Sequence, residues 1–335
     1  MGEPPLMRSF WDERQRAHAP RSEFFNGALH PAAEHHGRVD AILAAIGPTH
    51  VPADCGIAPL LRVHTPAYLD LLQSAHAEWR AAGREGDAFP YTFPIVGRRA
   101  LDLTRIDARL GQHSFDTSTP IAAGTWEAGY WSAQTALAGV AAVLGGERSA
   151  FALTRPPGHH AGADYLGGYC YLNSAAIAAE AALAAGRGQI AILDVDYHCG
   201  NGTQDIVAGR GDIAFASIHA DPKMDYPYFW GHADESGGNI LNLPLPRGTR
   251  WAEYQPALER ALDWLGGFAP DVLIVSFGAD TYAGDPISHF ALDTSDFTHM
   301  ARRIAALGVP TLVVMEGGYA VDALGANVAA FLGGF

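Results

Sequence analysis

Residues 189–198 read QIAILDVDYH, a short apolar run that ends in alternating acidic and histidine side chains. The apolar part is typical of a strand buried in a parallel sheet. Alternate residues of an extended chain point to the same side, so Asp194, Asp196 and His198 would crowd one spot at the end of this strand. Two carboxylates and an imidazole in one place indicate a bound metal ion. Cys199, the next residue, is another possible ligand, but it points the other way.

Runs of the same kind recur through the second half of the chain, separated by stretches of helical character. The further apolar runs are residues 149–153, 213–216, 271–277 and 311–315, and the helical stretches are residues 173–186, 251–266 and 294–307. Apolar strands that alternate with helices are typical of a parallel sheet covered on both faces. The sequence therefore predicts the α/β fold class, with long loops at the carboxyl ends of the strands.

The first half of the chain is less regular. Helices are predicted at residues 33–47 and 66–83, and residues 82–125 form a region rich in Gly and Pro. The tandem His35–His36 falls within the first helix, away from any strand end, and is interpreted as part of a solvent-exposed face. No linker composition or internal repeat marks a boundary, so we expect one domain over residues 1–335.

Composition limits the classes of partner. The chain has 335 residues, of which 48% are hydrophobic, as suits a globular enzyme. With 22 basic and 36 acidic residues, its formal net charge of −14 argues against a nucleic-acid partner and favours a cationic ligand. No apolar run approaches the ~20 residues that span a bilayer, and the first residues lack the apolar core of a signal peptide. Three cysteines are too few for a disulfide framework. We expect a cytoplasmic protein with no membrane partner.

Polar clusters follow five of the predicted strands. They are TRPPGHH (154–160), DVDYH (194–198), SIHAD (217–221), GADTYAGDP (278–286) and EGGY (316–319). In an open parallel sheet, ligands bind beyond the carboxyl ends of the strands. The five clusters therefore predict one functional site at this edge of the sheet.

The third member of the candidate metal group comes from another strand end. Asp280 would join Asp196 and His198, and three protein ligands with an open fourth position describe a catalytic Zn²⁺ site. Ligation rich in oxygen also suits Fe²⁺, Co²⁺ or Mn²⁺. Any one of the three residues could instead be an ion-paired core residue or a cap, but the three together favour the metal.

Two adjacent histidines, His159 and His160, follow a Pro-Pro-Gly segment that restricts the backbone. Paired imidazoles near a metal can serve as general base and as general acid or electrostatic partner, if other groups set their tautomers. Asp194 and Asn201 are available for that purpose. Tyr319 is either a hydrogen-bond donor to an oxyanion or a packing residue. No G-x-S-x-G, Walker A or strand-following G-x-G-x-x-G motif is present, so metal-assisted hydrolysis is the leading class.

Five motifs together resemble the histone deacetylase superfamily, and most closely its acetylpolyamine amidohydrolase branch. They are RPPGHHAG (155–162), GGYCYLNSAA (167–176), LDVDYHCGNGTQDI (193–206), GADTYAGDPIS (278–288) and VVMEGGY (313–319). The resemblance runs from about His30 to the end of the sequence. It implies the arginase/deacetylase α/β fold with a central eight-stranded parallel sheet. An arginase-type ureohydrolase would need further Asp and His ligands, which DVDYH lacks.

The resemblance also implies roles for single residues. One zinc ion per chain would be held by Asp196, His198 and Asp280. His160 would be the general base, contacting Asn201, and His159 its electrostatic partner, held by Asp194. Tyr319 would polarise the amide carbonyl. A structural K⁺ would bind Asp194, the carbonyls of Asp196 and His198, Ser217 and the carbonyl of Ile218. A second K⁺ would bind the carbonyls of Val207, Arg210 and Ile213.

For the substrate, the resemblance implies a narrow tunnel lined by Tyr169, Tyr226 and Ile287, with Asp116 as an acidic contact. Acetylated polyamines, or similar small N-acetylated primary amines, are the expected substrates. Asp107 is a second candidate for attracting ammonium groups, whereas Ser118 stands where a carboxylate can occur. Acetyl-lysine in peptides or proteins is the alternative substrate, and a metal-bound sensor or binding protein is the non-enzyme alternative. A homodimer is also implied.

Cys199 departs from the family pattern, which usually has His at this position. The residue is not a metal ligand in the family, so the predicted zinc group should be retained. We interpret Cys199 as a small buried thiol that fills the space of an imidazole incompletely; a redox switch is the alternative.

Overall fold

The computed structural model describes residues 7–94 and 101–335 of the chain. Within these residues lies a seven-stranded sheet in the order β1-β4-β9-β8-β5-β6-β7, and every neighbouring pair is parallel. The strands are β1 (Arg8–Phe10), β4 (Ser149–Ala152), β5 (Ile190–Asp194), β6 (Ile213–Ala220), β7 (Ile240–Leu245), β8 (Val272–Phe277) and β9 (Thr311–Met315). The predicted α/β class is confirmed. The sheet has seven strands in the described residues rather than the eight that the resemblance implied.

The helices match the sequence analysis best in the second half of the chain. They are α1 (Gly37–Ile46), α2 (Pro66–Ala81), α3 (Ile106–Gln112), α4 (Thr125–Leu144), α5 (Ser174–Ala184), α6 (Asn201–Val207), α7 (Trp251–Gly266), α8 (Thr294–Ala305) and α9 (Val321–Leu332). The predictions for α2 and α7 are confirmed almost to the residue. The tandem His35–His36 was wrongly placed within a helix, because α1 begins at Gly37. His35 is exposed, whereas His36 is half-buried.

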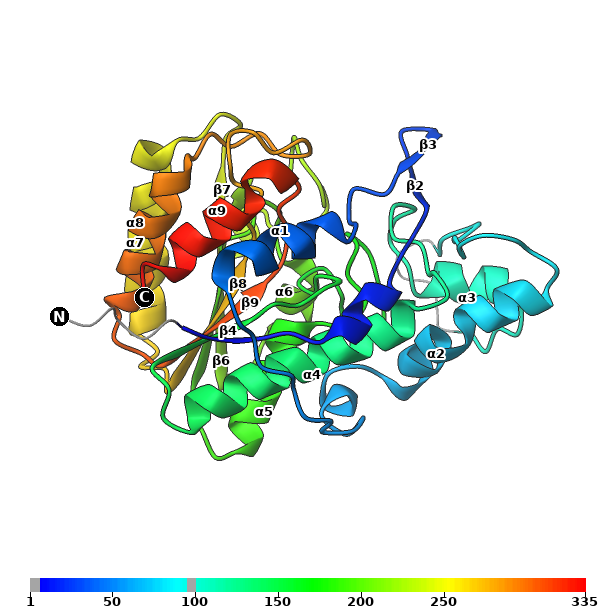
Figure 1. Ribbon diagram of the computed structural model, residues 1–335, viewed down its shortest axis with the longest axis horizontal. Coiled ribbons are helices and arrows are strands. Elements are labelled where there is room, and N and C mark those ends of the chain that lie inside the picture. The colour runs from blue at the N-terminus through cyan, green and yellow to red at the C-terminus, as the bar shows by residue number, and fades with distance from the viewer. Residues whose placement is uncertain (1–6, 95–100) are drawn as a thin grey trace.

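Helices cover both faces of the sheet (Figure 1). Side chains of α1, α7, α8 and α9 form one core with Phe151, Leu193 and Leu273. Side chains of α4, α5 and α6 form the other core with Ala152 and Ile192. Successive residues of one strand thus enter opposite cores, as the alternation of a strand requires. Every residue of β5 is buried, which explains why its sequence is a continuous apolar run.

A smaller third core lies beside the sheet, where α2 and α3 pack against parts of α4 and α5. The region expected to be an irregular loop, residues 82–125, contains α3; its residues 95–100 lie outside the described part of the chain. An antiparallel hairpin of β2 (Ser22–Phe25) and β3 (Ala28–Pro31) projects from the body of the molecule (Figure 1). Among the described residues, no helix is both long enough and apolar enough to cross a bilayer.

Candidate active site

Four adjacent strands, β4, β9, β8 and β5, end at the same edge of the sheet. The segments 155–160, 316–319, 278–287 and 194–198 follow these strands directly. The clusters that follow these four strands therefore converge at one edge of the sheet, as the sequence analysis expected. The fifth segment differs, because β6 extends to Ala220 and includes most of SIHAD within the strand.

The predicted metal group is assembled from the ends of β5 and β8. One ligand atom from each of Asp196, His198 and Asp280 lies within 4.8 Å of the others. The Nδ1 atom of His198 is 3.2 Å from Asp196 Oδ1 and 3.2 Å from Asp280 Oδ2. Ligands about 2.0 to 2.1 Å from a tetrahedral ion are about 3.3 Å apart, so this spacing fits a zinc-sized ion. Asp280 Oδ2 is buried and has no hydrogen-bond partner among the described residues, as a carboxylate oxygen reserved for a cation would.

Backbone amides and two glycines hold the carboxylates of this group in place. Gly317 N–H donates to Asp196 Oδ2 at 2.9 Å, and Tyr197 N–H donates to Asp280 Oδ1 at 3.0 Å. A Cβ atom on Gly317 would lie 2.5 Å from Asp280 Oδ2, and one on Gly278 would lie 2.0 Å from Asp196 Oδ2. Glycine at these two positions is therefore required for the loops to approach the carboxylates so closely.

The charges of the group are strongly coupled. Burial, together with the neighbouring Asp196 carboxylate, raises the pKa of Asp280 to about 7. Burial opposes protonation of His198, but the neighbouring carboxylates of Asp196 and Asp280 outweigh it and raise its pKa to about 10. A buried carboxylate whose pKa is raised by a neighbouring carboxylate is stabilised in its charged form by a cation between the two. The donor set therefore fits a divalent ion.

The two histidines after β4 have different partners. His159 Nδ1 lies 3.0 Å from Asp194 Oδ2, whereas His160 Nδ1 lies 2.6 Å from Asn201 Oδ1. The amide oxygen of Asn201 can only accept, so the proton of a neutral His160 sits on Nδ1 and leaves Nε2 free as a base. The sequence analysis expected both pairings, and the structure brings all four residues together.

The protonation states of the two rings are driven apart. Burial disfavours the charged form of His159, but Asp196 and Asp194 overcome this and raise its pKa to about 10. Burial, reinforced by the charges of His159 and His198, holds the pKa of His160 well below its ordinary value. At neutral pH a cationic His159 therefore lies beside a neutral His160, with ring centroids 4.0 Å apart.

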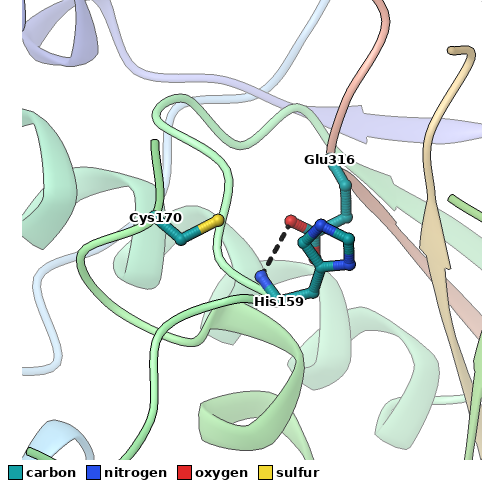
Figure 2. Close-up of side chains that lie close together, drawn as sticks. All are labelled: His159, Cys170 and Glu316. Carbon is teal, nitrogen blue, oxygen red and sulfur yellow. Dashed lines mark hydrogen bonds between the residues drawn. The ribbon is translucent and has the colours of Figure 1, made fainter. Parts of the chain in front are cut away.

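His159 also belongs to a second buried group, which it forms with Cys170 and Glu316 (Figure 2). The Oε2 atom of Glu316 accepts hydrogen bonds from the N–H groups of Gly158, at 2.6 Å, and His159, at 3.2 Å. Its Oε1 atom accepts from Ser276 Oγ at 3.1 Å. Burial raises the pKa of the Cys170 thiol far above its ordinary value. This carboxylate is engaged by three donors and its sulfur neighbour is neutral, so the group orders the histidine loop rather than offering a second metal site.

Tyr319 is 9% exposed and follows the two glycines after β9. Its backbone N–H donates to Asp285 Oδ2 at 2.7 Å, and Asp285 Oδ1 accepts from Ile287 N–H at 3.0 Å. The guanidinium carbon of Arg38 lies 4.8 Å from the centre of the Tyr319 ring. Burial raises the pKa of the phenol well above its ordinary value despite this cation, so the hydroxyl keeps its proton and can donate. Asp285 and Arg38 were not among the predicted site residues.

These groups open into a cavity of about 310 Å³. The predicted tunnel residues Tyr169, Tyr226 and Ile287 all line it, together with Asp116, His160 and Tyr319. Aromatic and aliphatic walls of this kind suit the methylene groups of a linear substrate.

The two predicted acidic contacts have different positions. Asp116 lines the cavity, but its Oδ2 atom accepts hydrogen bonds from Gly168 N–H at 2.7 Å and Tyr226 Oη at 2.8 Å. The carboxylate thus ties the aromatic wall together. Asp107 lies on α3, pairs with Arg84 and Arg105, and does not line the cavity, so its expected place at the tunnel mouth was wrong. Ser118 does line the cavity.

Glu23, on the β2–β3 hairpin, lines the same cavity and was missed by the sequence analysis. It is 3% exposed, and its Oε2 atom is buried with no hydrogen-bond partner among the described residues. Burial raises the pKa of the carboxyl group, although a contact with Tyr169 opposes the shift. Its only local signal is an acid in an apolar SEFF strand, where period-2 alternation points Glu23 and Phe25 to the same side.

The residues of the predicted first K⁺ site lie on neighbouring strands. Asp194 is the register partner of Ser217, and Asp194 Oδ1 accepts from Asp196 N–H at 3.1 Å. Ile218 follows within β6, and the carbonyls of Asp196 and His198 belong to the loop after β5.

Two carbonyls of the predicted second K⁺ site accept hydrogen bonds from the chain itself. Asn239 Nδ2 donates to the carbonyls of Val207 and Ile213, both at 2.7 Å, and Gly209 N–H fixes the amide by donating to its Oδ1 at 3.0 Å. Arg210 N–H donates to the carbonyl of Val207 as well, at 3.1 Å. A side-chain amide thus takes the position between two of the expected carbonyl ligands.

Cys199 is fully buried, and burial raises the pKa of its thiol well above the ordinary value. The side chain packs against Gly231, where an added Cβ would lie 2.8 Å from the sulfur and 2.6 Å from His219 Nε2. The neutral, enclosed thiol agrees with the interpretation of a packing residue, because reactive cysteines are exposed and have a lowered pKa.

Comparison with known proteins identifies the family. The family model described as the histone deacetylase domain matches residues 31–335. The chain belongs to the histone deacetylase family. Deacetylases of this family depend on a metal ion, and the group of Asp196, His198 and Asp280 is the candidate for it in this chain.

Several proteins that are similar to this chain are named as acetylpolyamine amidohydrolases. Acetylpolyamine amidohydrolase 1 of Pseudomonas aeruginosa is 50% identical, covering 98% of this chain and 99% of that protein. Acetylpolyamine amidohydrolase of Mycoplana ramosa is 42% identical, covering 98% and 99%. A crystal structure of acetylpolyamine aminohydrolase from Burkholderia pseudomallei superposes with a TM-score of 0.93 at 41% identity, covering 98% of both chains. The resemblance and the arginase/deacetylase fold inferred from the motifs are confirmed.

Proposed function

We propose that this protein is a zinc-dependent amidohydrolase that removes the acetyl group from acetylated polyamines or similar small N-acetylated primary amines. One observation carries the proposal: Asp196 and His198 of the candidate metal group, His160 and Tyr319 all line one cavity, which the carboxylates of Glu23 and Asp116 also line. The names of the relatives at 42 to 50% identity support the same substrate class.

Asp196, His198 and Asp280 would hold the metal ion, which we take to be Zn²⁺, with Fe²⁺ or Co²⁺ as possible substitutes. When bound there, such an ion lowers the pKa of a water molecule and polarises the amide carbonyl. The remaining chemistry belongs to residues of the chain.

His160 is the proposed general base. Its Nε2 atom takes a proton from the attacking water as the new C–O bond forms, and Asn201 keeps the ring in the required tautomer. The same proton then passes to the amine nitrogen as the C–N bond breaks, which yields acetate and a primary amine. His159, held as a cation by Asp194, stabilises the negative charge that develops during the attack.

Tyr319 is the proposed donor to the amide oxygen. Because its pKa is raised, the phenol is protonated at neutral pH and can donate to the negative charge that forms on that oxygen. Asp285 supports this role by fixing the backbone of Tyr319 through its N–H group.

Glu23 and Asp116 are proposed to favour a cationic amine. An acetylated polyamine keeps at least one ammonium group, and the unpartnered Oε2 atom of Glu23 is a ready acceptor for it. The net charge of −14 acts in the same direction at long range.

Further parts of the proposal rest on the family resemblance. They are a structural K⁺ bound by Asp194, Ser217 and the carbonyls of Asp196, His198 and Ile218, a single domain over residues 1–335, a homodimer, and a cytoplasmic location. The parallel register of Asp194 with Ser217 supports the K⁺ site, because it brings ligands from two strands together.

The decisive experiment compares kcat/KM for N-acetylputrescine, N-acetylcadaverine, acetylspermidine and an acetyl-lysine peptide. We expect the three small amines to be preferred. A preference for the peptide would transfer the proposal to the alternative substrate class. If a zinc-loaded preparation with K⁺ present hydrolyses none of the four, and His198→Ala binds as much metal as the parent protein, the chemistry and the metal group are both wrong.

A further inference from the structure

Glu34 is a buried carboxylate that the proposed mechanism does not use. It lies between the hairpin and α1, and its side chain is 1% exposed. Arg38 Nη1 donates to its Oε1 at 2.9 Å, while Arg155 donates through Nε at 2.8 Å and through Nη2 at 2.9 Å. Two buried arginines therefore share one carboxylate, and the ring of His18 lies beside it, with Nε2 3.6 Å from Oε2.

Arg38 connects Glu34 to the loop that carries Tyr319. Its Nε donates to the carbonyl of Gly318 at 2.7 Å, and its Nη2 donates to the carbonyl of Glu316 at 2.6 Å. All three nitrogens of the guanidinium are thus occupied, one by Glu34 and two by this loop. The planar fork also lies over the Tyr319 ring, 4.8 Å from its centre. Since the fork is rigid, the position of the carboxylate fixes the position of both carbonyls.

Arg155 depends on Glu34 less. Its backbone N–H donates to Gln15 Oε1 at 2.6 Å, and its Nη1 donates to the carbonyl of Gln15 at 3.2 Å. The loop that it begins is held a second time, at the N–H groups of Gly158 and His159, by the Glu316 carboxylate. In the Tyr319 loop, Asp196 and Asp285 hold N–H groups, whereas Arg38 holds the carbonyls of Glu316 and Gly318. Removing the Glu34 charge therefore loosens the carbonyl side of this loop, where Gly318 has φ +120° and tolerates many backbone conformations.

We propose that Glu34 is a positioning residue, which acts through Arg38 to place the Tyr319 hydroxyl where it meets the amide oxygen of the substrate. This inference rests on the proposed function, because it assumes the role of Tyr319. It assigns a task to the pair of Glu34 and Arg38 that a purely structural ion pair would not have. Glu34, Arg38 and Arg155 together carry one net positive charge, and Arg38 is the member that lies over the Tyr319 ring.

A double-mutant cycle between Glu34 and Tyr319 tests the proposal. Glu34→Gln keeps the shape and removes the charge, and Tyr319→Phe removes the hydroxyl. In the parent background we expect kcat per bound metal to fall about 10- to 100-fold, the loss produced by misplacing a catalytic group by about 1 Å, with KM nearly unchanged. In the Tyr319→Phe background the same substitution should change kcat less than about twofold, because residues that act as a unit are not additive. The control is Glu78→Gln. Glu78 lies on α2 and pairs with Arg109 of α3, so its substitution should leave kcat and KM unchanged in both backgrounds.

Folding is separated from positioning by two further variants. Glu34→Asp and Arg38→Lys keep the charges but shorten the pair or remove the fork, and both should show the same loss in kcat and the same dependence on Tyr319. They complete the cycle if Glu34→Gln does not fold. Equal losses of kcat in the parent and Tyr319→Phe backgrounds would overturn the proposal and leave Glu34 a structural residue. An inactive parent protein would instead overturn the proposed function.

Discussion

The unpartnered carboxylate of Glu23 gives the most direct test of substrate class. Glu23→Gln keeps the shape of the side chain and removes the negative charge that lines the cavity. The Oε2 atom is buried and has no hydrogen-bond partner in the part of the chain that the structure describes, so the neutral amide would offer an N–H group where the proposal requires an acceptor. The ammonium group of the substrate would then lose its partner in a place where water cannot fully replace it.

The size of the effect follows from Coulomb's law and from desolvation. Two unit charges about 4 Å apart attract by about 4 kcal/mol at an effective dielectric constant of about 20. Desolvation of both groups reduces the net value to about 1.5 to 3 kcal/mol, the usual range for a hydrogen bond to a charged group. This corresponds to a loss of about 10- to 150-fold in kcat/KM for N-acetylputrescine.

The assay measures kcat/KM for N-acetylputrescine and for N-butylacetamide, which has the same chain without the ammonium group. Glu23→Gln should lower kcat/KM for N-acetylputrescine and leave kcat/KM for N-butylacetamide unchanged. In the parent protein, the ratio of the first value to the second should fall as acid protonates Glu23, whose pKa is raised. Asp107→Asn is the control. Asp107 lies on α3, pairs with Arg84 and Arg105, and does not line the cavity. Equal losses for both substrates in Glu23→Gln would refute the ion pair and make Glu23 part of the cavity wall.

Three further predictions follow from the structure. Tyr319→Phe should lower kcat by about 10²- to 10³-fold with little change in KM, measured by steady-state kinetics on metal-loaded protein; a change confined to KM would contradict its role. Cys199→His should leave zinc content unchanged by elemental analysis, because Cys199 packs against Gly231 and is not part of the metal group; a large gain or loss of zinc would contradict this. Acid should destabilise the fold through buried neutral histidines: burial lowers the pKa of His18 to about 3 and those of His64 and His219 to about 4. The unfolded chain binds protons at these rings below about pH 6.5, whereas the folded chain does not. The contribution of the neutral rings to the free energy of unfolding is therefore complete above that pH and is lost as the pH falls toward 4. At pH 5 each ring costs about 2 kcal/mol, so the loss of unfolding free energy between pH 7.5 and pH 5, measured by denaturant unfolding, should be smaller by about that amount in His64→Gln than in the parent protein; an equal loss in both would show that the ring is solvated.

Elements with a clear pattern were predicted, and those without one were missed for physical reasons. Helix α4 buries 13 of its 20 residues, so it lacks the polar face that marks an amphipathic helix. Strand β7 contains Pro244, which is tolerated because the strand lies at an edge of the sheet. Strand β1 has only three residues, too few for a periodicity to appear.

The candidate site divides in the same way. Asp196, His198, Asp280, His160 and Tyr319 follow apolar strands, and the rule that parallel strands end at one edge was enough to bring them together. The chemistry of the site is thus carried by motifs that are each local in sequence.

Glu23, Glu34 and Arg38, which shape and hold the site, come instead from the first 40 positions, where no motif marks a functional residue. Arg38 reaches the carbonyl of Gly318 across 280 residues of chain, and Arg155 reaches Glu34 across 121. A buried glutamate looks the same in sequence as an exposed one; only the two arginines that surround it in space distinguish Glu34, and only the cavity distinguishes Glu23. Because motif reasoning detects reactive groups but not what positions them, the variants that best test this protein are at Glu23 and Glu34 rather than at the metal group. A substitution of a metal ligand abolishes activity under almost any mechanism, whereas the Glu34 cycle and the Glu23 substrate ratio each give a different result when the stated contact is absent.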